Sequence, residues 1–265
     1  MKILFFLFCS LFSLTIHAQN MLASITENAS RLPFQNMVGD ILQIGEQLRK
    51  PQLPLEKQKL IEKYNVLNTQ YQDSIAHYLK AFPNNEKAGY LSLQYFFDIR
   101  RDTPFLRKNL NIFLSTGVEN KFTQYIKEEL SGLDSAQVGK NIPTFLFKDI
   151  NKQSRTFPNG HKTLFVFWAS WCAPCRLETD QLKDQYDNIR KKDIDLVSVD
   201  LDDDPNRWLL ASKQDQIPWM NCFADGAWES RVARFFTLHQ IPQNVLIGSD
   251  GKILARNISI HQLLK

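Results

Sequence analysis

The sequence predicts an all-helical domain followed by an α/β domain with a central β-sheet. Three observations lead to this class. Residues 19–133 carry apolar side chains at three- and four-residue spacing almost throughout, which is the period of helices that bury one face. The run Thr163–Trp168 is instead apolar on both faces, the pattern of an interior strand covered on both sides. That strand leads into Cys172-Ala173-Pro174-Cys175 and then into a helical pattern.

The chain has 265 residues, enough for two ordinary domains, and its first 18 are predicted to be a signal peptide. Lys2 precedes the apolar run Ile3–Leu14, and His17-Ala18 then offers a cleavage site that ends in a small residue. Cys9 lacks the small residue expected before a lipoprotein cysteine, so we expect no stable membrane anchor. An uncleaved segment tethered to the membrane is the alternative, although the apolar run is short for a bilayer.

The domain boundary is predicted within Ser131–Lys140, a polar stretch with two glycines. The predicted domains are thus residues 1–18 (signal peptide), 19–133 (helical) and 134–265 (α/β). The helical part should hold about five helices, broken by prolines such as Pro83. Tyr64, Tyr71 and Tyr78 recur every seven residues and are interpreted as a packing seam. No residue of this part carries recognisable chemistry.

Charge and cysteine content narrow the function. The formal net charge is +4, with basic and acidic residues mixed along the chain, so no nucleic-acid partner is expected. Removal of the signal peptide leaves Cys172, Cys175 and Cys222, which is one pair and one odd thiol. Cys222 is interpreted as a small core residue of an apolar edge strand, and a second redox role is the alternative.

The remaining elements of the α/β domain follow from alternation, helical spacing and turn residues. In chain order we expect a hairpin of Pro143–Phe147 and Ser154–Phe157, the strand Thr163–Trp168, a helix from about Ala173 to Lys191, a strand Ile194–Val199, a helix Pro205–Gln214, an edge strand Trp219–Phe223, a helix Glu229–Phe236, a strand reached through Ile241–Ile247, a turn Ser249–Lys252, a strand Ile253–Asn257 and a short helix Ser259–Lys265.

The C-x-x-C pair at the strand-to-helix junction predicts thiol–disulfide chemistry. At a helix start Cys172 lies beside backbone N–H groups that have no intrahelical partner, which favours its thiolate. Cys175, one turn later, can close a small disulfide ring and resolve a mixed disulfide. Pro174 falls in the first turn, where its missing N–H costs nothing. A zinc site would need two further ligands that are not available nearby, and a permanent structural disulfide is the other alternative.

The stretch Phe167–Glu178, FWASWCAPCRLE, resembles the thioredoxin superfamily and most of all its TlpA/ResA-like branch of exported thiol–disulfide oxidoreductases. Gly139, Pro143 and Phe145 fit the G-x-x-x-P-x-F hairpin of the same branch. The resemblance implies a thioredoxin-like fold, a central mixed β-sheet flanked by helices. It also implies no cofactor beyond the redox-active disulfide Cys172–Cys175, and an upstream membrane or periplasmic electron donor.

Two further site residues follow from the resemblance. Thioredoxin has a buried Asp six residues before the first cysteine, where this chain has Val166. The branch often has a Glu three residues after the second cysteine, which here is Glu178. The resemblance implies that Glu178 shuttles the proton of Cys175, and a solvated helical glutamate is the alternative. Pro242 matches the superfamily cis-proline that faces the disulfide, and it would leave the backbone of Ile241 free to pair with substrate.

The remaining residues around the pair concern docking and metal binding. Trp171, Pro174 and Ile241 are predicted to form the substrate-binding surface, whereas Trp168 is interpreted as packing. The acidic turn Asp200–Asp204 invites a metal interpretation, but carboxylates before a helix also cap it. We therefore expect helix capping and no metal.

The predicted function is an exported, periplasmic thiol–disulfide oxidoreductase that reduces disulfides in other exported proteins. A disulfide isomerase is one alternative. The other is a scaffold whose helical domain binds a partner while the redox pair is secondary.

Overall fold

The structure, a computed structural model, describes residues 33–265. These residues divide into two compact units, residues 33–130 and residues 131–265. The predicted signal peptide, with Lys2, Cys9 and the expected cleavage site, lies outside the described residues. Within residues 33–265 no helix combines the length and the apolar character needed to cross a membrane.

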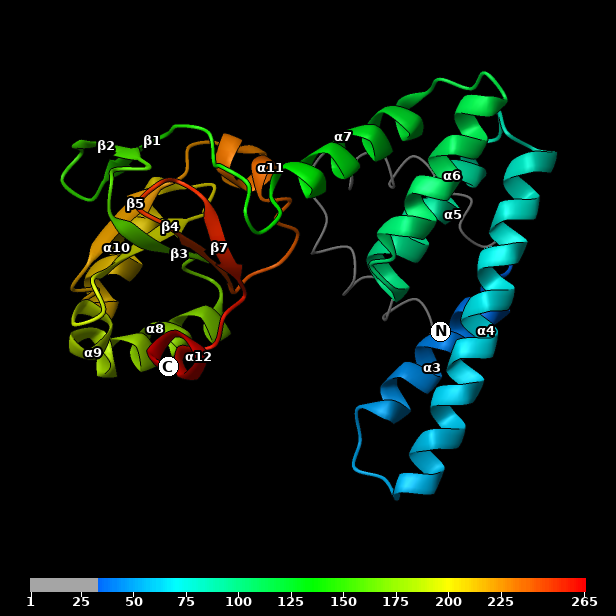
Figure 1. The fold of residues 1–265 in the computed structure, drawn as a ribbon, viewed down its shortest axis with the longest axis horizontal. Helices are drawn as coiled ribbons and strands as arrows, with labels where there is room; N and C mark the ends of the chain where they lie inside the picture. The colour runs from blue at the N-terminus through cyan, green and yellow to red at the C-terminus, as the bar shows by residue number, and fades with distance from the viewer. Residues whose placement is uncertain (1–32) are drawn as a thin grey trace. The chain divides into compact units, whose positions relative to one another are not determined.

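The first unit is helical, as the apolar spacing predicts (Figure 1). Its elements are α3 (Gln35–Leu48), α4 (Pro54–Ala81), α5 (Glu86–Gln94), the π-helical turn η3 (Tyr95–Ile99), α6 (Thr103–Ser115) and the start of α7 (Lys121–Ser135). The helix starts carry the expected residues. Asn85 caps α5 by accepting from the Lys87 N–H, and Asp102 caps α6 by accepting from the Phe105 N–H.

The tyrosines of α4 do pack as the seven-residue spacing indicates. Tyr71 is fully buried, and its hydroxyl lies 3.3 Å from Oε1 of Gln94. Phe34 meets Tyr71 and Tyr78 edge-on, with ring centroids 6.3 and 6.2 Å apart. These aromatic residues therefore form part of the core of this unit.

The second unit contains a seven-stranded mixed sheet in the order β2-β1-β5-β4-β3-β6-β7. Its strands are β1 (Phe145–Asp149), β2 (Ser154–Phe157), β3 (Lys162–Trp168), β4 (Ile194–Asp200), β5 (Met220–Phe223), β6 (Gln243–Ile247) and β7 (Ile253–Arg256). β3, β4 and β5 run parallel, whereas β6, β7 and the β1–β2 hairpin are antiparallel additions. The strands alternate with helices, which is why the central part is parallel.

Helices cover both faces of this sheet (Figure 1). They are α8 (Ala173–Asp184), α9 (Tyr186–Arg190), α10 (Pro205–Asp215), the 3₁₀ turn η4 (Ala227–Glu229), α11 (Arg231–Phe235) and α12 (Ile260–Leu264). Phe165 and Phe167 of β3 pack with residues of α11, and Leu164 and Val166 pack on the opposite face with residues of α8, α9 and α12. This two-sided cover explains why Leu164–Trp168 of β3 is apolar at every position.

Several boundaries differ from those predicted. The predicted edge strand is β5, but the β1–β2 hairpin pairs with its outer side, so β5 is an interior strand. The helix predicted to run to Lys191 breaks at Gln185, whose φ and ψ of −109° and 6° leave the helical region. That break places Tyr186 against Trp219, with ring centroids 5.3 Å apart. The helix predicted at Glu229–Phe236 is the short α11.

The stretch predicted as a linker is partly helical, because α7 runs on to Ser135. A Cβ at Gly132 would lie 2.5 Å from the Cγ2 of Thr237, so the close approach of this helix to Thr237 requires glycine. Beyond α7, the Gly139 N–H donates to Ile253 and the Lys140 carbonyl accepts from it. The polar, glycine-containing stretch Ser131–Lys140 is therefore a connection that packs against the second unit.

Candidate active site

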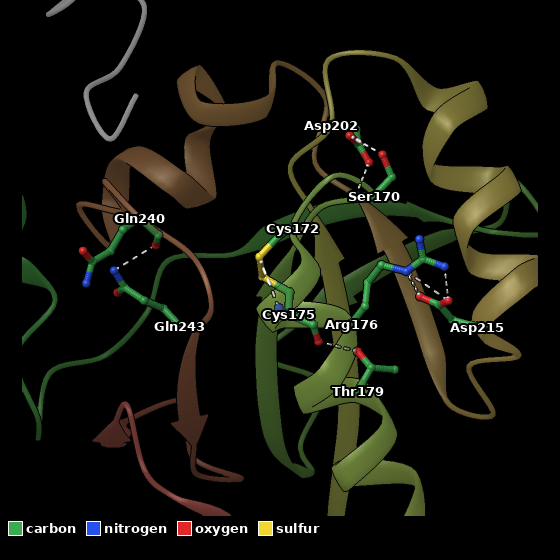
Figure 2. The surroundings of a disulfide bond; sticks show 9 residues. All are labelled: Ser170, Cys172, Cys175, Arg176, Thr179, Asp202, Asp215, Gln240 and Gln243. Atoms are coloured by element: carbon green, nitrogen blue, oxygen red, sulfur yellow. Dashed lines mark hydrogen bonds and ion pairs between the residues drawn. A yellow bond between two sulfur atoms is a disulfide. The ribbon is translucent and has the colours of Figure 1, made fainter. Parts of the chain in front are cut away.

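Cys172 and Cys175 form a disulfide at the junction of β3 and α8 (Figure 2). Cys172 is the N-cap residue of α8, and its Sγ accepts from the Cys175 N–H at 3.3 Å. Pro174 lies in the first turn, as predicted. A sulfur that already accepts from a helix N-terminal N–H is placed where the helix dipole stabilises negative charge.

The buried pair directly follows an exposed aromatic residue in the sequence. Cys172 and Cys175 are 4% and 1% exposed, whereas Trp171 is 55% exposed. Trp168 is fully buried in the same apolar cluster as both cysteines, in agreement with its interpretation as packing. Exposed Leu177, one turn along α8, adds a second apolar side chain to the surface beside the pair.

Glu178 is half-buried on α8, one turn after Cys175. Its Oε1 accepts from the Asn244 side-chain amide at 3.4 Å, and its Oε2 is buried without a hydrogen-bond partner among the described residues. Burial raises the pKa of the Glu178 carboxyl, and the hydrogen bond from Asn244 partly offsets that rise. One oxygen of the carboxyl therefore accepts a hydrogen bond from Asn244, and the other has no partner among the described residues.

Asn244 is a site residue that our sequence reasoning missed. It pairs with Val166 across β3 and β6 and is 7% exposed. Besides Glu178, its amide donates to the Ile258 carbonyl at 3.1 Å, and its Oδ1 accepts from the Ile258 N–H at 2.9 Å. The signal was an amide side chain in the otherwise apolar run Val245-Leu246-Ile247, because a buried amide needs partners.

The Ile241–Pro242 peptide bond is cis, the conformation that the resemblance implied. A cleft of about 590 Å³ lies beside it, between α8, the start of β6 and the segment before α12. Half of the residues that line it are uncharged and polar, and the acid there is Glu178. The lining comprises Pro174, Leu177, Glu178, Gln181, Gln240, Pro242, Gln243, Asn244, Asn257, Ile258, Ser259 and Ile260.

Ile241 and Gln243 occupy different surroundings. Ile241 is partly buried and packs against the cluster that holds the disulfide. The side chain of Gln243, the first residue of β6, donates to the Gln240 carbonyl at 3.1 Å, and Figure 2 shows both glutamines across from the cysteines. The structure thus brings Glu178, Pro174 and Pro242 to one cleft, with Trp171 at the exposed end of the preceding turn.

The acidic turn divides into two kinds of residue. Asp204 caps α10 by accepting from the Asn206 N–H at 2.9 Å, as predicted. The capping prediction is wrong for Asp200 and Asp202, which are fully buried and contact Ser170 and each other instead. No group of three or more His, Cys, Asp or Glu side chains within residues 33–265 is placed to hold a metal ion.

Cys222 lies apart from the redox pair. It is fully buried on interior strand β5, in the cluster on the opposite face of the sheet from the cysteines of α8. Burial raises the pKa of its thiol to about 12, so it stays protonated at neutral pH. These surroundings fit the small core residue that the sequence indicates.

Comparisons with known proteins agree with this geometry. A family model described as thioredoxin-like matches residues 160–253. The thiol-disulfide oxidoreductase ResA of Bacillus cereus is 22% identical over 127 residues, covering 47% of this chain and 72% of that protein. The C-terminal domain of a putative thiol-disulfide oxidoreductase from Bacteroides thetaiotaomicron is 30% identical, with a TM-score of 0.46, over 49% of this chain and 92% of that structure.

A third comparison extends into the helical part. A thioredoxin-like protein from Bacteroides caccae has a TM-score of 0.53 and 14% identity, covering 78% of this chain and 80% of that structure. This similarity concerns the fold alone. It covers more of the chain than the second unit contains.

Proposed function

We propose that the chain is an exported thiol–disulfide oxidoreductase that reduces disulfides in other exported proteins through its thioredoxin-like carboxyl-terminal domain. The observation that carries this proposal is the placement of Cys172 as the N-cap of α8, next to exposed Trp171. A nucleophilic thiolate and an apolar docking surface are what attack on a partner protein requires.

The reaction begins with the reduced pair, in which Cys172 is a thiolate and Cys175 a thiol. The Cys172 sulfur attacks one sulfur of the partner disulfide, which forms a mixed disulfide and releases the other partner sulfur as a thiolate. Cys175 loses its proton and attacks Cys172, which releases the second partner sulfur. Two electrons pass to the partner, whose two thiolates take up one proton from Cys175 and one from solvent.

Glu178 is the group that we propose for the Cys175 proton. It lies one helical turn from Cys175, and burial raises the pKa of its carboxyl, which makes it a better proton acceptor. Asn244 holds one of its oxygens and leaves the other without a partner. No cofactor other than the disulfide is needed for this step.

The cleft beside Pro242 is the proposed binding place for the partner. Its amide side chains can both donate and accept, as an extended peptide backbone does. Pro174, Trp171 and the Ile241 backbone would flank the partner cysteine. An upstream membrane or periplasmic donor would return electrons to the oxidised pair, and a periplasmic location follows from the predicted signal peptide.

Insulin reduction by the wild type and by Cys172→Ser tests the activity. We expect the wild type to precipitate the insulin B chain in the presence of a thiol reductant and Cys172→Ser to be inactive. Cys222→Ser is the matched control, because it removes a thiol from the opposite face of the sheet. Equal rates for the wild type and Cys172→Ser would refute the proposal.

A further inference from the structure

Asp202 holds the turn that presents the redox pair. Its Oδ2 accepts from the Ser170 N–H at 2.8 Å and its Oδ1 accepts from the Ser170 hydroxyl at 2.9 Å. Ser170 precedes Trp171 and Cys172, and Figure 2 shows it joined to Asp202 beside the disulfide. Since both oxygens accept, the geometry is that of an ionised carboxylate. A buried charge is thus fixed to the active-site turn.

Asp200 in turn supports Asp202. The Asp202 N–H donates to Oδ1 of Asp200 at 2.9 Å, and both residues are fully buried. Oδ2 of Asp200 has no partner among the described residues, and neither has Nε1 of Trp168, the residue opposite it in the β3–β4 register. Burial, followed by the charge of Asp202, raises the pKa of Asp200 to about 9. At neutral pH Asp200 therefore keeps its proton, and its Oδ1 supports the backbone of Asp202.

Two charged residues of α8, Arg176 and Glu178, follow the cysteines closely in the sequence. Arg176 of α8 is paired with Asp215 of α10, with contacts of 3.0 and 3.1 Å from its Nε, so the two cancel. Glu178 is itself an acid, so it cannot offset the charge of Asp202. The positive end of α8 stabilises a Cys172 thiolate, whereas the Asp202 carboxylate opposes it.

We propose that Asp202, supported by Asp200, positions the Ser170–Cys172 turn and through its buried charge makes the reduced pair a stronger reductant. The reduced form contains a thiolate and the disulfide form does not. A nearby negative charge therefore raises the free energy of the reduced form alone, which favours donation of electrons to a partner disulfide. This inference rests on the proposed reductant function and assigns Asp202 as a positioning residue for it.

The test is the equilibrium of the cysteine pair with reduced and oxidised glutathione at pH 7. We expect Asp202→Asn to shift the equilibrium toward the dithiol by roughly tenfold, the size expected for one buried charge nearby, or about 30 mV for a two-electron couple. The pKa of Cys172, read from alkylation rates, should fall in the same variant. Asp203→Asn is the matched control, because it removes the same charge from a side chain that is 77% exposed.

Ser170→Ala separates the effect of the Asp202 charge from the effect of a loosened turn. It is also the variant to use if Asp202→Asn does not fold. It removes a donor from Asp202 and keeps the charge, so the pKa of Cys172 should rise slightly. A fall in the Cys172 pKa in Ser170→Ala would indicate a structural effect and overturn the proposal, as would equal potentials for Asp202→Asn and Asp203→Asn. The glutathione equilibrium involves no protein partner, so failure here is distinct from failure of insulin reduction.

Discussion

The side-chain amide of Asn244 donates to Oε1 of Glu178 at 3.4 Å, and the same side chain bonds both backbone groups of Ile258. Asn244 therefore ties the helix of the redox pair to the segment that leads into α12. The proton affinity of the Glu178 carboxyl, on α8, thus depends on Asn244 of β6, two positions beyond the cis-proline.

Asn244→Asp should raise the pH at which the mixed disulfide is resolved most readily. The substitution replaces an amide donor to Glu178 by a carboxylate, and a neighbouring like charge raises the pKa of a carboxyl further. The measurement is stopped-flow resolution of a Cys172 adduct as a function of pH. Asn257→Asp is the comparison variant, because it puts a carboxylate into the same cleft while its Oδ1 keeps the acceptor role toward the Asn244 N–H. Superimposable profiles for Asn244→Asp and the wild type would contradict the prediction.

Glu178→Gln should slow resolution of the mixed disulfide and leave the first attack by Cys172 nearly intact. The first step uses a thiolate already formed, whereas the second needs the buried Cys175 thiol to ionise. General acid–base assistance is typically about 10²–10⁴-fold, and a half-buried site that water can reach should lie near the lower limit. Rapid-quench measurement of the Cys172 adduct should show it accumulating. Asp180→Asn, on the exposed face of α8, should behave as the wild type.

Cys172 should titrate well below an ordinary thiol, and Cys175 should not. Alkylation rates against pH should give a midpoint below about 7.5 for Cys172, the range of cysteines at helix starts. The Cys175→Ser variant isolates this titration. A midpoint near 8.5, the value of a free cysteine, would mean that the start of α8 gives the thiolate no stabilisation.

Asp200→Asn should flatten the dependence of stability on pH. The pKa of Asp200 is raised in the folded protein to about 9 from 3.8. A raised pKa means that this group's contribution is fully present below about pH 4 and is lost as the pH rises toward 9. The variant cannot ionise there, so its urea midpoint relative to that of the wild type should increase over this window. Parallel curves for the two proteins would show that Asp200 does not hold its proton in the folded state.

Local patterns were enough to predict the central elements of the sheet and the redox pair. β3 is apolar on both faces and Cys172 follows it at a helix start, so both follow from short-range signals. The position of β5 depends on the hairpin β1–β2, which lies far away in sequence, and alternation within Trp219–Phe223 cannot reveal that partner. The break at Gln185 likewise has no glycine or proline to announce it.

The residues of the candidate site also divide into those that local sequence patterns predict and those that depend on distant segments. Glu178 and Pro242 are found from their spacing to the cysteines, because family spacing places them. Asn244 and Asp202 act through partners in other segments, Ile258 and Ser170, and those contacts form only when the chain has folded. Charge alone suggested that all acids of the turn cap α10, whereas burial separates Asp202 from Asp204.

The connection before β1 has a consequence for association between chains. Gly139 and Lys140 exchange hydrogen bonds with Ile253, and Asn141 bridges to Lys252, so the beginning of the outer edge of β7 is already occupied. The other edge, β2, has four residues and carries Arg155 paired with Asp149. Short, charged or covered edges resist strand addition and aggregation. The short and partly covered edges of the sheet therefore leave the cleft beside the disulfide as the place where we propose that a partner chain pairs.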